Sequence, residues 1–488
     1  MSINLNKSEV EIRENRNYSI ISYTGTAKNL CHASDKKCLK CYENFFNQCG
    51  DCSAQRAFLQ VALIKDAAVV NHAPIGCAAD FSLFNAQKRT GLKKRGAKIL
   101  DLNALSTNIE EKDTIYGASN KLEITIKEAY KRYNPKAIFV TASCASGIIG
   151  EDIETVVNST EKELGIPVVP IYCEGFKSKV WTSGSDAVYH GVLRKIVKPA
   201  KKRRTDLINI INFSDRDSYG PLLAKIGLKA NYILPLSSIS DIEKISEAAA
   251  TGHICETLST YMAKGLEQEF GVPEIKSPPP YGIDWTDLWL REIGKITNKE
   301  KLVEKVIKEE KEGIKLQLVK LREKLNGKKV YIACGSSFGH SLISIATDLG
   351  MKVIGEASIH HHQKFDTEDQ IVNSLKNMIK KYGDVENYLV CNKQPYQIVN
   401  ILRTLKPDLL MLRHETLGSL GVKLGIPTYF ANDANICIGY DGVIGVGEDI
   451  LKIFDRKHLL ENISQHCKLP YTDWWFEQNA SIFQGGVK

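Results

Sequence analysis

The sequence predicts an α/β protein whose parallel β-sheets are flanked by helices. Apolar runs and their alternation with helical segments indicate this fold class, and the chain length indicates several domains. Short apolar runs rich in β-branched residues alternate with longer amphipathic segments through most of the chain. Such runs suit strands that are buried on both faces, and strand–helix alternation is typical of helix-covered parallel sheets. The length of 488 residues is enough for about three domains.

Seven apolar runs are the expected strands, and the segments between them carry helical patterns. The segments 151–164 and 241–270 are expected to be helical because they are rich in Glu, Lys and Ala. Several expected strands end at small or glycine-containing turns that include a cysteine. Ligands of open α/β sheets lie outside the carboxyl ends of the strands, so these cysteines are placed to face a cleft. The expected strands are 137–140, 168–172, 207–211, 330–333, 353–354, 388–390 and 409–412.

Two charged segments mark the expected domain boundaries. The segment 198–206 follows one α/β block, and the Lys/Glu-rich segment 299–327 is expected to be a long helix that stops at Asn326-Gly327. We therefore expect boundaries near 205 and 326. The predicted divisions are an N-terminal extension with cysteines at 1–48 and α/β domains at 49–205, 206–326 and 327–488.

Charge and hydropathy narrow the range of partners. The net charge is +8, and the most compact basic run, 198–204, has no aromatic residue within it. A single-strand nucleic-acid surface would interleave aromatic and basic residues, so a solvated linker is favoured and a docking surface for an acidic partner is the alternative. No apolar run reaches the length of about 20 residues that a spanning helix needs. The N-terminus lacks an apolar signal segment, so we expect a cytoplasmic protein without nucleic-acid or membrane partners.

The 13 cysteines are expected to be reduced. An odd number of cysteines in a long chain without an export signal argues against a disulfide framework. Reduced thiols are either buried small hydrophobes or metal ligands. Cys173, Cys334, Cys391, Cys437 and Cys467 are expected to be structural.

Four cysteines of the N-terminal segment form a separate group. Cys31, Cys38, Cys41 and Cys49 precede the first expected domain, and two-residue spacers separate 38 from 41 and 49 from 52. This spacing lets two thiolates reach one metal or cluster. An additional cluster, a zinc site and an oxidisable extension remain as alternatives.

Small residues accompany three further cysteines, Cys52, Cys77 and Cys144. Glycine and alanine allow the backbone to approach a bulky cluster closely, and backbone N–H groups can then point at sulfide. A helix that starts after Cys144 would direct its positive N-terminal end at the thiolate and stabilise its charge. Buried cysteines without a metal are the alternative.

Several short motifs, in this order, resemble those of nitrogenase component 1 subunits, and the resemblance extends over roughly residues 49–455. Each motif is short, and their order and spacing make the match specific. They are Pro74-Ile75-Gly76-Cys77, Cys144 with Ile149-Gly150-Glu151-Asp152-Ile153, Cys173-Glu174-Gly175-Phe176, His253-Ile254-Cys255, Glu269-Phe270-Gly271-Val272-Pro273, Gly425-Ile426-Pro427 and Gly439-Tyr440-Asp441-Gly442.

The resemblance implies three Rossmann-like domains, with clusters in the inter-domain cleft and at a subunit interface. It implies that Cys52, Cys77 and Cys144 bind the iron of a bridging cluster of the P-cluster or 4Fe-4S type, with Cys49 as an alternative to Cys52. A related β-type subunit would donate the remaining thiolates in an α2β2 complex. Cys255 matches the cysteine that holds a complex iron–sulfur cofactor in the family's catalytic subunit.

An electron donor is also implied. The family places ATP hydrolysis on a separate iron protein, which delivers low-potential electrons to component 1. This chain has neither a Walker loop nor a Gly-x-Gly-x-x-Gly motif that opens a helix. The absence of both motifs suits a subunit that receives electrons rather than one that hydrolyses ATP.

The chain departs from the nitrogen-fixing pattern at several positions. Asn432 stands near the position of the histidine that ligates the molybdenum cofactor, and an amide is a poor ligand for iron or molybdenum. Trp181 and Ser185 stand where a glutamine and a histidine are expected, and Thr416 stands near the position of the lysine that grips the cofactor's organic acid. We therefore expect a substrate other than dinitrogen.

A run of three histidines follows the expected strand 353–354. His361 and His362 are candidate proton donors because imidazole titrates near neutral pH. The alternative is a solvated loop, and His190, His340 and His414 are weaker candidates.

Three functions follow as hypotheses. The first is a nitrogenase-like reductase subunit acting on a small-molecule substrate, and the second is a non-catalytic scaffold that assembles and hands on an iron–sulfur cofactor. The third is a metal-free α/β binding protein. The sequence specifies neither the substrate nor the cofactor's heterometal.

Overall fold

The computed structural model describes residues 2–7, 22–39, 52–177, 181–212, 216–361, 373–391, 395–413, 415–431 and 438–478. The chain forms two compact units, here called unit 1 (Met1–Tyr18 with Asp51–Glu274) and unit 2 (Ser19–Gly50 with Ile275–Lys488). Both are built from parallel sheets flanked by helices, so the predicted fold class is confirmed. The domain boundaries near 205 and 326 stay predictions.

Unit 1 contains a four-stranded parallel sheet in the order β3-β2-β4-β5. The strands are β3 (Ala104–Ser106), β2 (Ala67–His72), β4 (Ala137–Ala142) and β5 (Val168–Ile171). Every residue of β2, β4 and β5 is buried, as continuous apolar runs require. The chain leaves β2 toward β3 on one side and then crosses to β4 on the other, so the connections reverse direction between β2 and β4.

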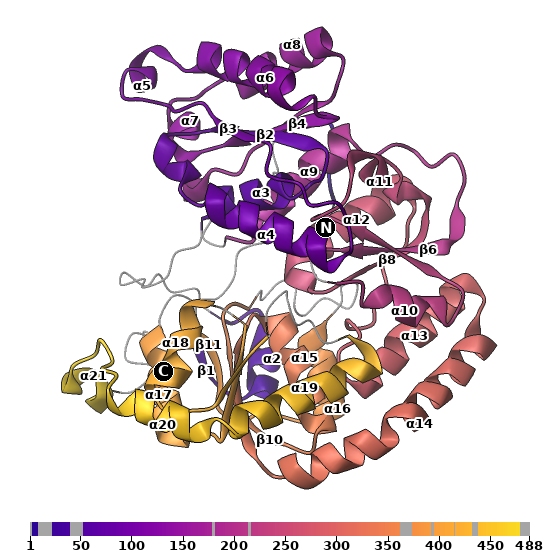
Figure 1. Cartoon of the computed structure of the whole chain (residues 1–488), viewed down its shortest axis with the longest axis vertical. Coiled ribbons are helices and arrows are strands. Elements are labelled where there is room, and N and C mark those ends of the chain that lie inside the picture. The colour runs from indigo at the N-terminus through magenta and orange to yellow at the C-terminus, as the bar shows by residue number, and fades with distance from the viewer. Residues whose placement is uncertain are drawn as a thin grey trace. The chain divides into compact units, whose positions relative to one another are not determined.

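Helices cover both faces of this sheet. Figure 1 shows α6 (Ser119–Tyr133) and α8 (Ile153–Leu164) along one face and α3 (Ser53–Ala62) along the other. Alternate residues of a strand point to opposite faces, so β2 contributes Ala68 and Val70 to the α6–α8 core and Ala67 and Val69 to the α3 core. Hydrophobic burial on both faces therefore fixes the register of the central strands.

A second parallel sheet of unit 1 has the order β7-β6-β8. Its strands are β7 (Lys229–Ile233), β6 (Arg204–Ile211) and β8 (Ala248–His253). Helix α12 (Glu256–Phe270) follows β8 and packs on α9 (Ser183–Lys195), which also packs on α3. One hydrophobic core therefore joins both sheets of unit 1.

The helical segment predicted at 241–270 is wrong in its first half. The structure divides it into short helical turns, strand β8 and helix α12. Ala248 to Ala250 form the first half of strand β8 although alanine favours helices, because β8 pairs with β6 in the sheet. Tertiary packing overrides local propensity here.

Unit 2 contains one six-stranded sheet in the order β1-β11-β10-β9-β12-β13. All neighbours are parallel except β1, which is antiparallel to β11. Strand β1 and helix α2 (Ala27–Asp35) come from the predicted N-terminal extension, so part of that extension belongs to the sheet of unit 2. The strands are β1 (Ser22–Gly25), β11 (Tyr388–Cys391), β10 (Lys352–Ser358), β9 (Lys329–Cys334), β12 (Leu409–Leu412) and β13 (Thr428–Phe430).

The remaining helices complete the two units. The predicted long helix at 299–327 is α14 (Glu300–Leu325). It ends shortly before Gly327, whose backbone has a positive φ of +72°. In the described ranges no helix combines the length and apolar character needed to cross a bilayer. The others in unit 1 are η1 (Ile75–Ala78), α4 (Phe81–Lys94), α5 (Asp113–Tyr116), α7 (Cys144–Ile148), η2 (Gly175–Lys177), α10 (Tyr219–Ala224), α11 (Ile239–Glu243) and η3 (Ile245–Glu247). Those in unit 2 are α13 (Ile283–Thr297), α15 (Ser336–Asp348), α16 (Ser374–Tyr382), α17 (Pro395–Leu405), α18 (Glu415–Lys423), α19 (Gly439–Phe454), α20 (Lys457–Gln465) and α21 (Asp473–Glu477).

Candidate functional site

Two of the predicted cysteine ligands follow neighbouring strands of the four-stranded sheet. Cys77 lies in η1, shortly after β2, and Cys144 is the first residue of α7, shortly after β4. Strands β2 and β4 pair directly, and the chain connections reverse direction between them. In open α/β sheets this reversal point is where ligands bind, outside the carboxyl ends of the strands. The fold therefore brings these two thiols to one edge of the sheet.

The surroundings of Gly175 show that the sulfur of Cys52 lies near the sulfur of Cys144. A Cβ atom at Gly175, which begins η2 after β5, would lie 2.9 Å from Cys52 Sγ and 3.4 Å from Cys144 Sγ. Both sulfurs thus crowd the space that a side chain at this position would need. Partial burial raises the pKa of the Cys77 thiol, and the nearby thiols of Cys52 and Cys144 raise it further. The three cysteines, here called the three-thiol group, lie together.

Local structure holds the sulfur of Cys52 in position. Cys52 is the N-cap residue of α3, and its side chain makes no capping hydrogen bond. The hydroxyl of Ser53 donates to the carbonyl oxygen of Cys173 at 3.0 Å, which ties the start of α3 to the segment before Gly175. A Cβ atom at Gly184 would overlap the Ser53 carbonyl oxygen, so α9 approaches α3 more closely than a larger residue would allow.

A capping box holds Cys144. The Ser143 side chain accepts from the backbone N–H of Ser146, and the Ser146 side chain accepts from the backbone N–H of Ser143. This reciprocal pair fixes the turn between β4 and α7. The Cys144 sulfur therefore projects from an ordered helix start.

The three-thiol group suits a cluster of several metal ions better than one ion. Within the described ranges, no three His, Cys, Asp or Glu side chains converge closely enough to hold a single metal ion. An iron–sulfur cluster offers several iron atoms, so its cysteine ligands need not meet at one point. The bare backbone of Gly175 supplies the close approach that such a bulky group needs.

Cys255 occupies a corresponding position on the other sheet of unit 1. It is the half-buried N-cap residue of α12, just after β8, and the chain reverses direction between β6 and β8. His253 ends β8 and is buried, with its Nε2 3.6 Å from Glu274 Oε1. Cys255 therefore lies at the carboxyl edge of the three-stranded sheet rather than in the three-thiol group.

The histidine run follows β10 in unit 2. His360 and His361 are both buried, which speaks against the solvated-loop alternative for these two residues. His361 Nε2 shares a hydrogen bond with the Ser34 hydroxyl of α2 at 2.6 Å. His362 lies outside the described residues.

Other predicted positions are described only in part. Cys31 lies on α2, and burial raises the pKa of its thiol, with Asp35 adding to the effect. Cys38 is exposed, and its thiol donates to the Ala33 carbonyl oxygen at 3.3 Å. Cys41, Cys49, Asn432, Cys437 and His414 lie outside the described residues, as does the side chain of Thr416.

Arg56 is a site residue that sequence reasoning missed. Its guanidinium lies 5.1 Å from the centre of the Trp181 ring, and its Nε donates to the Ser185 hydroxyl at 3.0 Å. A second donor, Nη2, reaches Asn212 Oδ1 at 3.1 Å. Trp181 and Ser185 are two of the predicted departures from the nitrogen-fixing pattern, and both contact this one cation. The only signal in the sequence is that Arg56 stands one helical turn after Cys52 on α3.

Glu151 is a second residue that was missed, and it links the three-thiol group to the surrounding fold. Its carboxylate is 3% exposed and accepts hydrogen bonds from the Ala118 backbone N–H and from the Ser119 hydroxyl, the latter at 2.7 Å. Its own backbone N–H donates to the Ser146 carbonyl oxygen at 3.1 Å. Through its side chain and its backbone, this one residue thus connects the start of α6 to the helix that begins at Cys144.

His72 completes this connection on the side of β2. Its Nε2 lies 3.8 Å from Glu151 Oε2, and its Nδ1 shares a hydrogen bond with the Thr107 hydroxyl at 3.1 Å. Burial lowers the pKa of His72 to about 4, although Glu151 acts in the opposite direction. The ring is therefore neutral at pH 7, and it packs at the base of the segment that leads to Cys77.

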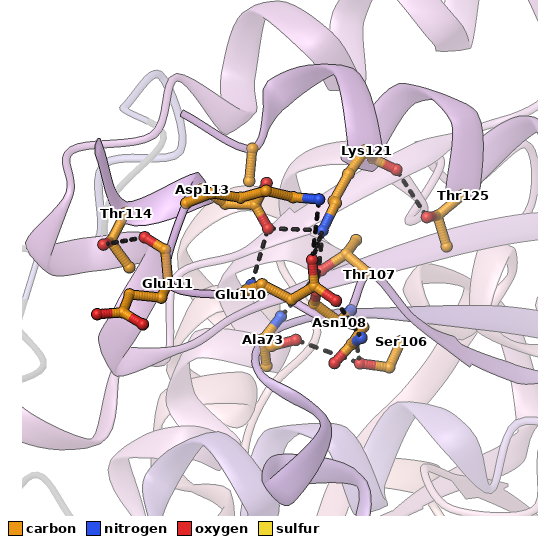
Figure 2. A network of polar contacts seen from close by, with 12 residues as sticks. Ala73, Ser106, Thr107, Asn108, Glu110, Glu111, Asp113, Thr114, Lys121 and Thr125 are labelled. Atoms are coloured by element: carbon orange, nitrogen blue, oxygen red, sulfur yellow. Dashed lines mark hydrogen bonds and ion pairs between the residues drawn. The ribbon is translucent and has the colours of Figure 1, made fainter. Parts of the chain in front are cut away.

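A partly buried ion-pair network continues from these residues, as Figure 2 shows. Lys121 Nζ contacts Asp113 Oδ2 at 2.6 Å and Glu110 Oε2 at 3.3 Å. The backbone N–H of Glu110 donates to Asp113 Oδ2 at 2.7 Å, and that of Ala73 donates to the Thr107 hydroxyl at 3.2 Å. The loop after β3, α5 and the segment before Cys77 are thereby held together.

Comparison with known proteins agrees with this fold. The model of the family described as nitrogenase component 1 type oxidoreductase matches residues 52–455, so the chain belongs to that family. The predicted resemblance is confirmed. The chain is 29% identical over 393 residues to a nitrogenase iron-molybdenum cofactor biosynthesis protein NifE of Methanococcus maripaludis. The aligned residues cover 78% of each chain.

Two further proteins are similar to this chain, one in sequence and one in structure. A nitrogenase molybdenum-iron protein alpha chain of Methanosarcina barkeri is 28% identical over 376 residues, which are 75% of this chain and 68% of the relative. The solved structure of nitrogenase Cp1 at pH 6.5 superposes with a TM-score of 0.71 at 22% identity, covering 88% of this chain and 92% of that chain. The structural match supports the fold.

Removing the Glu151 carboxylate should loosen the segment that carries Cys144. Hydrogen bonds to a charged group contribute about 1.5–3 kcal/mol each, so in Glu151→Ala the amides of 113–119 and 144–150 should exchange with deuterium at least about tenfold faster. Hydrogen–deuterium exchange with mass spectrometry measures this. The matched control is Asp152→Ala, which removes the cap of α8 and should affect only the first turn of α8. Unchanged exchange at 144–150 in Glu151→Ala would contradict the linking role.

Proposed function

We propose that the chain is the α-type subunit of a nitrogenase-like reductase. It receives low-potential electrons from an ATP-dependent iron protein and passes them to a substrate other than dinitrogen. The observation that carries the proposal is the crowding of Cys52, Cys77 and Cys144 around the bare backbone of Gly175. Membership of the component 1 family supports the same assignment.

The three-thiol group would hold a bridging cluster of the P-cluster or 4Fe-4S type, and a related β-type subunit in an α2β2 complex would donate the other ligands. Cys49 remains the alternative to Cys52. When bound, such a cluster supplies one-electron storage and transfer. Apolar side chains around the group support a covering partner, since Ile75, Ile148 and Phe176 are 64%, 73% and 54% exposed.

Cys255 would hold the interior iron–sulfur cofactor by one thiolate. Its position at the start of α12 favours the charged sulfur, because the positive helix end stabilises an anion. His361 and His362 are the proposed proton donors. The burial of His361 and its hydrogen bond to Ser34 would hold one tautomer of the ring in a fixed orientation.

Three positions support a substrate other than dinitrogen. Trp181 and Ser185 contact Arg56 rather than offering an amide and an imidazole. Asn432 would be a weak second ligand to the cofactor. The aromatic ring of Trp181 and the cation of Arg56 would favour an anionic or polarisable small molecule over an apolar diatomic gas.

A second candidate function is a scaffold for nitrogenase-type cofactor biosynthesis. Several of the most similar curated relatives are cofactor biosynthesis proteins, including one of Nostoc at 28% identity over 372 residues. A scaffold would use the same cysteines and a looser grip on the cofactor, with Cys255 as the single strong ligand.

Turnover separates the two candidates. The complex would be purified without oxygen, mixed with its iron protein and ATP, and assayed for loss of candidate substrates and for transfer of cofactor to an apo-acceptor. Substrate loss supports the reductase, whereas transfer without substrate loss supports the scaffold. A colourless, iron-free complex purified without oxygen would contradict both.

Cys77 and Cys255 should have separable effects. Cys77→Ala should remove the bridging cluster's electron paramagnetic resonance signal and its iron, because a thiolate ligand is lost. Cys255→Ala should spare that signal and abolish cofactor retention. Cys467→Ala is the control, because this half-buried residue lies outside both sites and its loss should leave the iron content unchanged. Full iron content in both site variants would refute the ligand assignment.

Gly175 should be intolerant of any side chain. In Gly175→Ala the new Cβ would lie 2.9 Å from Cys52 Sγ, so the sulfur must shift, and we expect at least half of the bridging-cluster iron to be lost. Gly76→Ala is the matched control beside Cys77, since a Cβ there meets nothing within 4 Å. Iron analysis and circular dichroism would measure loading and folding. Equal loading of the two variants would show that the close approach is unimportant.

A further inference from the structure

Arg56 connects the two places in unit 1 at which the proposed iron ligands lie. It follows Cys52 by one turn of α3, a rise of about 6 Å, and its backbone N–H donates to the Cys52 carbonyl oxygen at 3.0 Å. Its side chain reaches the segment after β6, where Nη2 donates to Asn212 Oδ1 at 3.1 Å. One residue therefore spans from the start of α3 to the carboxyl edge of the three-stranded sheet.

Asn212 lies beside the strand that leads to Cys255. It comes directly after Ile211, the last residue of β6, and Ile211 pairs with His253, the last residue of β8. Cys255 comes two residues after His253. The guanidinium of Arg56 is thus bonded next to the strand end that leads to Cys255, while its backbone belongs to α3.

Three contacts hold the guanidinium of Arg56 in one place. Its Nε donates to the Ser185 hydroxyl on α9 at 3.0 Å, and the centre of the Trp181 ring lies 5.1 Å away. Ser185 and Asn212 are both buried, so the group is fixed in a partly buried place. A guanidinium carries its positive charge throughout the physiological pH range. Ser185, Trp181 and Asn212 are neutral, so these contacts hold the charge without cancelling it.

Close packing of α3 on α9 directs the Arg56 side chain. A Cβ atom at Gly184 would overlap the Ser53 carbonyl oxygen and would lie 3.0 Å from the backbone nitrogen of Ala57. The two helices therefore meet backbone against backbone beside the Arg56–Ser185 pair. This contact keeps Ser185 opposite Arg56, so the cation stays at the start of α3.

A fixed positive charge at this place favours the reduction of an iron–sulfur cluster held nearby. Reduction by the electron donor adds one electron and one unit of negative charge, and no bond forms or breaks. A cation lowers the energy of the reduced form by Coulomb attraction, which is stronger in a partly buried place than in water. The net charge around a cluster is one of the features that set its reduction potential.

We propose that Arg56 is a positioning residue whose charge raises the reduction potential of the bridging cluster. Arg56 ligates no iron and acts by electrostatic attraction. Since the guanidinium also contacts the residue after β6, an electron that passes toward Cys255 stays near the same charge. The inference rests on one part of the proposed function, the bridging cluster held by the three-thiol group, and it applies to the reductase and to the scaffold alike.

A redox titration of the loaded complex tests the effect of the charge. The complex would be purified without oxygen, and the bridging-cluster signal would be followed by electron paramagnetic resonance as the potential is lowered. In Arg56→Gln the midpoint should shift to a lower potential, so that at the wild-type midpoint the ratio of oxidised to reduced cluster rises at least about threefold. Arg56→Lys keeps the charge and should retain most of the wild-type midpoint. An unchanged midpoint in Arg56→Gln would overturn the proposal.

Arg95→Gln is the matched control in unit 1. The Arg95 guanidinium makes a similar contact, 4.4 Å from the centre of the Tyr232 ring. Arg95 is the C-cap residue of α4, whose 14 residues give a rise of about 21 Å, so it lies at the opposite end of α4 from Cys77. Its loss should leave the midpoint unchanged. An equal shift in Arg95→Gln would show that net charge rather than position matters, and would overturn the proposal.

Asn212→Asp tests the charge without removing Arg56. The new carboxylate would take the place of the amide oxygen that Nη2 already contacts and would neutralise the guanidinium as an ion pair. The midpoint should shift to a lower potential, as in Arg56→Gln. If Arg56→Gln does not fold, an unchanged midpoint in Asn212→Asp still overturns the proposal.

The same preparations separate this inference from the proposed function. A wild-type complex that holds the cluster but consumes no substrate would contradict the reductase, and the midpoint comparison would still decide the role of Arg56. Equal midpoints in a complex that does consume substrate would overturn the role of Arg56 alone. An iron-free wild-type complex would refute the bridging cluster and, with it, this role.

Discussion

The site in unit 1 depends on one geometric constraint, which is that three loops at the edge of a parallel sheet must bring their backbones within reach of the same sulfurs. Strands β2 and β4 pair directly, so the segments that carry Cys77 and Cys144 leave the sheet side by side. The turn after β5 then passes so close that a side chain at position 175 would force the Cys52 sulfur to shift. The capping box of α7 and the hydrogen bond from Ser53 to the Cys173 carbonyl oxygen hold this arrangement.

Buried acids act in opposite ways in the two units. Glu151 is surrounded by backbone and hydroxyl donors and lies at the N-terminus of α6, so its carboxylate fastens loops by charge-assisted hydrogen bonds. Among the described residues the Glu356 carboxyl group has no hydrogen-bond donor, it rests against the backbone of α15, and burial raises its pKa well above the usual range. The same functional group is thus a structural anchor in one place and a buried acid that favours its neutral form in the other, because of what faces it.

The sequence predicted the fold class correctly, the ligand role of the cysteines stays a prediction, and sequence reasoning failed where tertiary contacts decide. The motifs around Cys77 and Cys144 are local, so their order could be recognised. Strand β2 was missed because Ala-Ala-Val-Val-Asn-His is short and ends in polar residues, which only the paired strands β3 and β4 make compatible with a buried strand. Arg56 and Glu151 could not be singled out, since their roles come from partners more than 30 residues away along the chain.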